Sequence, residues 1–146
     1  MLQYPQKITL CGFGGQGIIL TAVMLGTAAV TKSGLYAVQT QSYGSEARGG
    51  QCQAELIIDK SPINSPVAEK KNLLVALFQS AYEKYLPTLS EDGVLVIDPQ
   101  LVTDLKKPIA HTFAVPATQI AVDLGNRMAA NMVVRQKMAL GDGDPP

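Results

Sequence analysis

Short apolar runs alternate along the chain with longer segments in which apolar residues recur at helical spacing. An apolar run of about four to eight residues between turn residues is typical of a buried strand. Runs of this kind predict strands at residues 7–11, 35–41, 51–59, 73–78, 93–98 and 109–114. The helical spacing predicts helices at residues 16–32 and 79–86, and from Pro116 to about Met138 with a break at Gly125. Strands that alternate with helices predict an α/β fold.

The expected architecture is a Rossmann-like three-layer sandwich with a mainly parallel sheet. Strands that are buried on both faces have continuous apolar runs, as residues 73–78 do. Residues 51–59 differ, because apolar side chains at the even positions alternate with Gln53 and Glu55. This alternation is typical of a strand with one wetted face and favours an antiparallel strand, with a parallel one left open. Residues 1–140 are expected to form one domain, and residues 141–146 a disordered tail.

The helix predicted at residues 16–32 is apolar around its whole circumference. From the second turn up to Lys32 its only polar side chains are Thr21, Thr27 and Thr31. A helix that is apolar on all faces is buried on all faces. Because a sheet covers one side only, the other side is expected to be covered by another helix of this chain or by a partner chain. Both alternatives are open from the sequence.

Composition narrows the class of protein. The 146 residues are enough for one domain with a core, and 47% of them are hydrophobic while 16% are charged. A formal net charge of zero disfavours a nucleic-acid-binding surface, which needs clustered lysines and arginines. No signal-peptide pattern precedes the first strand, and the uncharged residues 17–30 are too few to span a membrane. We therefore expect a cytoplasmic protein that binds neither nucleic acid nor membrane.

The cysteines and the single histidine offer little to a metal ion. Cys11 and Cys52 form no C-x-x-C pair, and His111 is the only histidine. Iron–sulfur clusters usually take four thiolates and structural zinc takes four ligands, so neither centre is expected in this chain. Both cysteines lie in or beside apolar strand patterns and are expected to be buried and reduced.

Isolated ionisable residues have simple structural explanations. We expect His111 to be a hydrogen-bonded core or edge residue, Asp98 to end a strand and Asp123 to occupy a solvated helix position. The run Glu-Lys-Lys at residues 69–71 is expected to be solvated.

Glycines at G-x-G-x-x-G spacing follow the first predicted strand and lead directly into a helix. In this context the motif cradles phosphates, because the backbone N–H groups at a helix N-terminus bind anions. A dinucleotide site also needs a carboxylate at the end of the second strand, where residues 38–41 read Val-Gln-Thr-Gln. NAD and NADP are therefore expected to bind weakly or not at all. The turn is either another kind of anion site or a tight turn that packs helix on sheet. Its residues are Gly12, Gly14, Gly15, Gln16 and Gly17.

A second polar segment follows the second predicted strand. Open α/β sheets place their ligand sites at the carboxyl ends of strands. Arg48 can bind a carboxylate or phosphate through two hydrogen bonds, and Glu46 can pair with Arg48 or with a group across an interface. An idle surface loop is the alternative, but three glycines and an aromatic residue favour an interface or site loop. The candidate residues are Tyr43, Gly44, Glu46, Arg48, Gly49 and Gly50.

These segments together resemble the gamma subunits of 2-oxoacid:ferredoxin oxidoreductases. The resemblance covers roughly residues 7–134 and rests on CGFGGQGIIL at residues 11–20, QSYGSEARGG at residues 41–50, SPI at residues 61–63 and SP at residues 65–66. The form Tyr-Gly-x-Glu-x-Arg-Gly-Gly is its most specific part and is similar to the branch that acts on 2-oxoglutarate or branched 2-oxoacids. The family's C-terminal helix usually continues beyond the point where this chain ends, so the resemblance implies that some packing surface is missing.

The resemblance implies an accessory subunit, most closely that of a 2-oxoglutarate enzyme, with no catalytic residue of its own. The complex would convert a 2-oxoacid and coenzyme A to acyl-CoA, carbon dioxide and reduced ferredoxin. Its cofactors would be thiamine diphosphate, Mg, an iron–sulfur cluster and coenzyme A, none bound by this chain alone. The implied partners are alpha and beta subunits, with or without a delta subunit, and ferredoxin through the complex; a homodimer is also open. The glycine turn would help to hold coenzyme A. The alternative is a stand-alone CoA- or nucleotide-binding module without redox activity.

Overall fold

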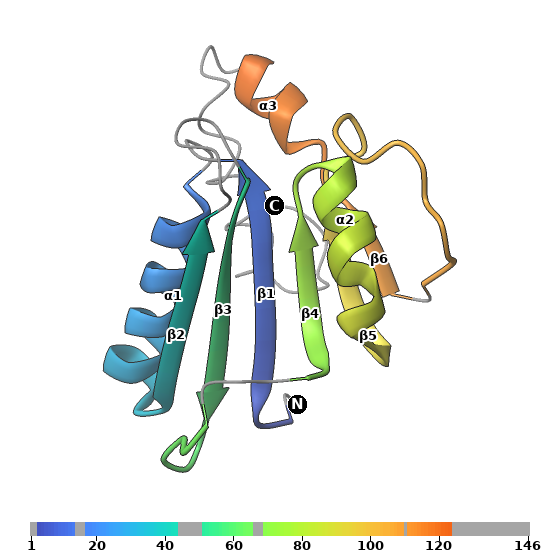
Figure 1. Ribbon diagram of the computed structural model, residues 1–146. Coiled ribbons are helices and arrows are strands. Elements are labelled where there is room, and N and C mark those ends of the chain that lie inside the picture. Colours follow the sequence, from blue (N-terminus) through green and yellow to red (C-terminus); the bar gives the residue numbers. More distant parts are fainter. Residues whose placement is uncertain (1–2, 14–16, 44–50, 66–68, 110, 124–146) are drawn as a thin grey trace.

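The computed structural model contains one six-stranded sheet (Figure 1). It describes residues 3–13, 17–43, 51–65, 69–109 and 111–123. The strand order across the sheet is β2-β3-β1-β4-β5-β6. The strands are β1 (Gln6–Phe13), β2 (Tyr36–Tyr43), β3 (Gln51–Asp59), β4 (Lys71–Ala76), β5 (Leu89–Ile97) and β6 (His111–Ala114).

The sheet is mixed, with β3 running against its neighbours. β1 pairs in parallel with β4, β4 with β5 and β5 with β6, whereas β3 pairs antiparallel with both β1 and β2. The antiparallel placement that the alternation in residues 51–59 favours is therefore confirmed. The five remaining strands all point the same way, so their carboxyl ends meet at one edge of the sheet.

Helices cover both faces of the sheet, which gives the predicted three layers (Figure 1). Helix α1 (Ile18–Ser33) lies against β1, β2 and β3, and helix α2 (Gln79–Tyr85) lies against β4 and β1 on the opposite face. A 3-10 turn, η1 (Leu86–Thr88), joins α2 to β5. Helix α3 (Ala117–Asp123) follows β6; the remainder of the predicted C-terminal helix lies outside the described residues.

Each face of the sheet has its own apolar core, because consecutive strand residues point to opposite faces. In β4, Val75 packs in the cluster beneath α1, while Leu74 and Ala76 pack in the cluster beneath α2. The sheet is therefore buried on both sides at its centre, as the continuous apolar run predicts.

Helix α1 begins and ends at glycines in the left-handed conformation, Gly17 with φ 72° and Gly34 with φ 66°. At its C-terminus the Gly34 N–H donates to Val30 O at 3.2 Å and the Leu35 N–H to Ala29 O at 3.1 Å, which satisfies two of the last carbonyl groups. Only glycine takes this backbone conformation without strain. The predicted end of this helix at about residue 32 is thus confirmed.

Several large apolar side chains on the outer side of α1 are partly exposed. Leu20, Val23, Met24 and Val30 are 44–57% exposed. The helix predicted after Pro116 lies mostly outside the described residues, so cover of this side by another helix of the chain and cover by a partner chain both stay predictions. No helix among the described residues combines the length and the hydropathy that a bilayer crossing requires.

Candidate functional site

The candidate site lies at the carboxyl edge of the sheet, between β1 and β4. The helices that follow these two neighbouring strands, α1 and α2, leave toward opposite faces (Figure 1). Such a switch point opens a crevice at the strand ends, where open α/β sheets place their ligands. The glycine turn begins at this point.

Two aromatic rings meet at the switch point. Phe13, the last residue of β1, stacks on Phe78 with ring centroids 4.1 Å apart and an interplanar angle of 26°. The Leu77 N–H donates to Cys11 O at 3.0 Å and so extends the pairing of β1 with the segment after β4. Phe78 is buried and Phe13 is exposed, so the pair presents an apolar ring face at the crevice. This pair was not predicted from the sequence, although Phe13 lies inside the glycine motif.

The glycine turn has the features of an anion-binding helix start. Gly12 lies in β1 opposite Cys52, and Gly17 caps α1 without a side-chain hydrogen bond. The first turn of α1 contains no acidic residue, and its Thr21 donates through both N–H and Oγ1 to Gly17 O at 2.9 and 2.8 Å. A helix N-terminus without its own carboxylate favours an external anion. Gly14, Gly15 and Gln16 lie outside the described residues.

The strand pairing brings the two predicted site segments to the same edge. Cys52 of β3 lies between Gly12 of β1 and Tyr43 of β2 and pairs with both. The glycine turn and the start of the Tyr43–Gly50 segment are therefore two strands apart. Of the candidates in that segment, Gly44, Glu46, Arg48, Gly49 and Gly50 lie outside the described residues. Strand β3 begins directly after the segment, at Gln51, whose Nε2 donates a hydrogen bond to Ser80 Oγ of α2 at 3.2 Å.

A small cavity of about 60 Å³ lies beside this edge, beneath α2. Among the residues that line it, Ser42, Gln53 and Lys84 bring polar groups and Cys11 and Phe78 bring apolar ones. The buried Oε1 of Gln53 has no hydrogen-bond partner in the described part of the chain. The volume suits about two water molecules and no larger ligand.

Both cysteines are buried on opposite faces of the sheet. Cys11 packs beneath α2 and donates from Sγ to Val75 O at 3.3 Å, while Cys52 packs beneath α1. Burial raises the pKa of the Cys11 thiol far above its ordinary value, with a smaller contribution from Cys52, and burial also raises the pKa of Cys52. The prediction that both cysteines are buried is confirmed, and the sheet between them separates their side chains.

In the folded chain, we expect neither thiol to react quickly with a disulfide reagent such as DTNB. A raised pKa lowers the thiolate fraction at pH 8, and burial blocks access, so reaction has to wait for opening of the fold. The folded chain should release the coloured thiolate of DTNB at least about 100-fold more slowly than the chain unfolded in guanidinium chloride. Rapid release of one equivalent from the native chain would contradict this assignment and make that cysteine a surface group.

Asp98, at the end of β5, is a structural residue. Its carboxylate is fully buried and accepts hydrogen bonds from the Gln100 N–H at 2.9 Å and the Thr118 N–H at 2.7 Å. It therefore joins the loop after β5 to the start of α3. His111 is exposed on the edge strand β6 and Asp123 is exposed at the end of α3, as predicted.

The expectation for residues 69–71 is wrong at Lys71. Glu69 and Lys70 are exposed, but Lys71 is buried and its Nζ lies 3.1 Å from Glu55 Oε1 of β3. A buried ammonium needs such a partner, because an unpaired charge is costly to take out of water. The one sequence signal for this ion pair was the alternating pattern of β3, which places Glu55 on the face of the sheet that the Lys71 side chain reaches. No group of three or more metal-ligating side chains occurs among the residues described.

Residues 7–136 match the family model for pyruvate ferredoxin/flavodoxin oxidoreductase, which covers most of the chain. The chain belongs to this family. Within it, the chain is 40% identical over 141 residues to the 2-oxoglutarate synthase subunit KorC of Methanothermobacter thermautotrophicus, which covers 92% of this chain and 75% of that one.

Two solved structures of this oxidoreductase family share the fold. The gamma subunit of a keto/oxoacid ferredoxin oxidoreductase from Geobacter sulfurreducens superposes with a TM-score of 0.79 at 38% identity, over 94% of this chain and 78% of that one. The 2-oxoglutarate:ferredoxin oxidoreductase of Magnetococcus marinus, solved with 2-oxoglutarate, coenzyme A and succinyl-CoA, gives 0.78 at 21% identity, over 91% of this chain and 23% of that one. At that identity the second likeness concerns the fold alone.

Proposed function

We propose that this chain is the gamma subunit of a 2-oxoglutarate:ferredoxin oxidoreductase. The observation that carries the proposal is the similarity to a KorC subunit over 92% of the chain, together with the likeness to a gamma-subunit structure at 38% identity. The complex oxidatively decarboxylates 2-oxoglutarate with coenzyme A, and it yields succinyl-CoA, carbon dioxide and reduced ferredoxin. Thiamine diphosphate and iron–sulfur clusters, which the other subunits would hold, would supply the decarboxylation and electron-transfer chemistry.

In this proposal the chain binds coenzyme A and contacts its partner subunits at the carboxyl edge of the sheet. The start of α1 has no side-chain cap and no carboxylate, and the first N–H groups of a helix have no partner within the helix, which suits a phosphate of coenzyme A. The stacked Phe13 and Phe78 offer an apolar ring face beside it. The Tyr43–Gly50 segment starts two strands away, where Glu46 and Arg48 would contact coenzyme A or a partner subunit. The partners are alpha and beta subunits, with or without a delta subunit, in the cytoplasm.

A stand-alone CoA-binding module is the second candidate, favoured by the uncapped α1 N-terminus at the switch point. It differs from the subunit in one respect: its ligand site would be complete within this chain. A gamma subunit shares its site with other chains and should bind coenzyme A weakly when isolated.

Co-expression distinguishes the two functions. A tagged copy of this chain should co-purify with the alpha and beta subunits of the same organism, in equal amounts, and should lack oxidoreductase activity when purified alone. Calorimetry on the isolated chain should show at most weak coenzyme A binding. Micromolar coenzyme A binding without any co-purification would favour the module and contradict the subunit assignment.

A further inference from the structure

An uncharged surface follows one side of the molecule, where β2 ends the sheet. Among the described strands β2 pairs with β3 only, so its other edge presents backbone N–H and C=O groups. Its eight residues, YAVQTQSY, contain no charged residue, no proline and no glycine. Natural edge strands are usually protected by charges, prolines, bulges or short length. The opposite edge, β6, is only four residues long, whereas β2 lacks each of these protections.

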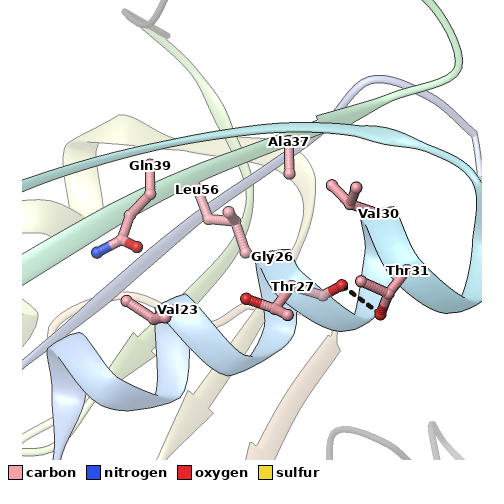
Figure 2. Close-up of a pocket in the computed structure, with 8 residues that line it drawn as sticks. All are labelled: Val23, Gly26, Thr27, Val30, Thr31, Ala37, Gln39 and Leu56. Atoms are coloured by element: carbon pink, nitrogen blue, oxygen red, sulfur yellow. Dashed lines mark hydrogen bonds between the residues drawn. The ribbon is translucent and has the colours of Figure 1, made fainter.

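Helix α1 adds an apolar stripe to the same side. Val23, Thr27 and Val30 are spaced by four and three residues, which places them on one face of the helix. Figure 2 shows this stripe facing Ala37 and Gln39 of β2 across a groove of about 330 Å³. Both valines are exposed, at 44% and 47%.

The groove is shallow because the helix lies close to the sheet. Gly26 faces Leu56, and a Cβ atom at this glycine would lie 3.2 Å from Leu56 Cδ1. The α1 stripe and the β2 edge therefore form one continuous surface, without a charged side chain among the residues that line the groove.

We propose that this surface is a dimer interface, in which a second copy of the chain adds its β2 antiparallel to β2. The free backbone edge of a strand is complementary to itself under a two-fold axis. A two-fold axis perpendicular to the sheet keeps the α1 helices of both copies on the same face of the combined sheet. The paired strands would lie about 4.8 Å apart. The two copies of α1 would then face each other through Val23, Thr27 and Val30. Their axes would be separated by about 8–10 Å, the distance at which helices pack.

Charge favours a second copy over a charged partner. The β2 strand and the groove-lining part of α1 carry no charge, so two copies meet without repulsion, while a charged partner finds no counter-charge. The chain as a whole has a formal net charge of zero, which removes long-range repulsion between copies. One side of a standard interface has about 20–30 residues. The proposed surface contains part of a 16-residue helix and part of an eight-residue strand, so it has fewer residues than a standard interface. We therefore expect the dimer to dissociate with a constant of about 1–100 µM.

Sedimentation equilibrium of the full chain, purified alone, tests the interface. A monomer–dimer equilibrium is expected, and both Val23→Asp and Val30→Asp should weaken it at least about tenfold, because each change places a carboxylate without a counter-charge against the apolar stripe of the other copy. Leu105→Asp is the matched control: Leu105 is 52% exposed in the loop after β5, so the same change there should leave the dimer intact. Gln39→Lys places a charge on the strand side of the groove and should act like the valine variants.

Thermal unfolding confirms that each variant is folded, and hydrogen exchange of β2 amides should slow as the concentration rises. A chain that stays monomeric at several hundred micromolar overturns the proposal. So does a dimer that Val23→Asp, Val30→Asp and Gln39→Lys all leave unchanged. If these variants instead abolish binding of an alpha or beta subunit while the chain alone is monomeric, the surface docks another subunit and the self-association is wrong.

Discussion

Replacing Tyr82 by alanine is expected to lower the free energy of unfolding by about 3–5 kcal/mol, since truncation of a buried aromatic residue leaves a cavity in a packed core. Tyr82 of α2 is fully buried in the cluster between α2 and the sheet. Its hydroxyl also accepts a hydrogen bond from the Lys106 N–H at 2.9 Å and so attaches the loop after β5 to α2. A loss of this size removes a large part of the stability of a typical domain, about 5–15 kcal/mol.

Two further variants separate the contributions to this loss. Tyr82→Phe removes the hydroxyl alone and should cost about 1 kcal/mol. Leu105→Ala truncates a large apolar residue at an exposed loop position and should cost less than about 1 kcal/mol. Urea unfolding at one fixed protein concentration measures all three. If Tyr82→Ala were no more destabilising than Leu105→Ala, the packing of α2 on the sheet would be wrong.

Replacing Arg48 by alanine should impair the assembled enzyme and leave the isolated chain folded. Loss of a two-bond contact to a buried anion or to a partner carboxylate typically costs about 2–5 kcal/mol, which is about 30-fold to several thousand-fold in affinity or rate. An exposed loop residue without such a contact changes stability by within about 0.5 kcal/mol. Subunit affinity and succinyl-CoA formation in the reconstituted complex distinguish the two roles.

The Arg48 experiment has two matched controls. Arg48→Lys keeps the charge and loses the two-bond geometry, so it should restore only part of the activity. Lys107→Ala removes a cation from an exposed loop elsewhere and should have no effect. Unchanged melting, affinity and rate for Arg48→Ala would make the Tyr43–Gly50 segment an idle loop. Unfolding of the isolated chain would make Arg48 a structural residue instead.

Much of the fold could be predicted from local patterns. The strand at 51–59 has the predicted bounds, and its alternation favoured the antiparallel direction because one side of β3 carries Gln53 and Glu55. Strand β5 begins at Leu89, four residues before the predicted start. The apolar run there begins only after Gly93, so pairing of Leu89 with Lys71 had no local signal.

The site could be predicted only in part, because its geometry depends on strand order. The glycine motif and the Tyr43–Gly50 segment were found from residue types, and β3 brings their strands together through Cys52. The stack of Phe13 on Phe78 joins residues that follow two different strands, so the sequence alone gives no sign of it. The burial of Lys71 was missed for the same reason, since its partner Glu55 lies on another strand.

Reduction of ferredoxin by reconstituted alpha and beta subunits, with and without this chain, tests the proposed function most directly. Supplied with 2-oxoglutarate and coenzyme A, the mixture should gain activity as the chain is added and saturate at one chain per alpha–beta pair. The same mixture supplied with pyruvate should be much slower. An alpha–beta pair whose activity and substrate preference are unchanged by the chain would contradict its assignment as the gamma subunit.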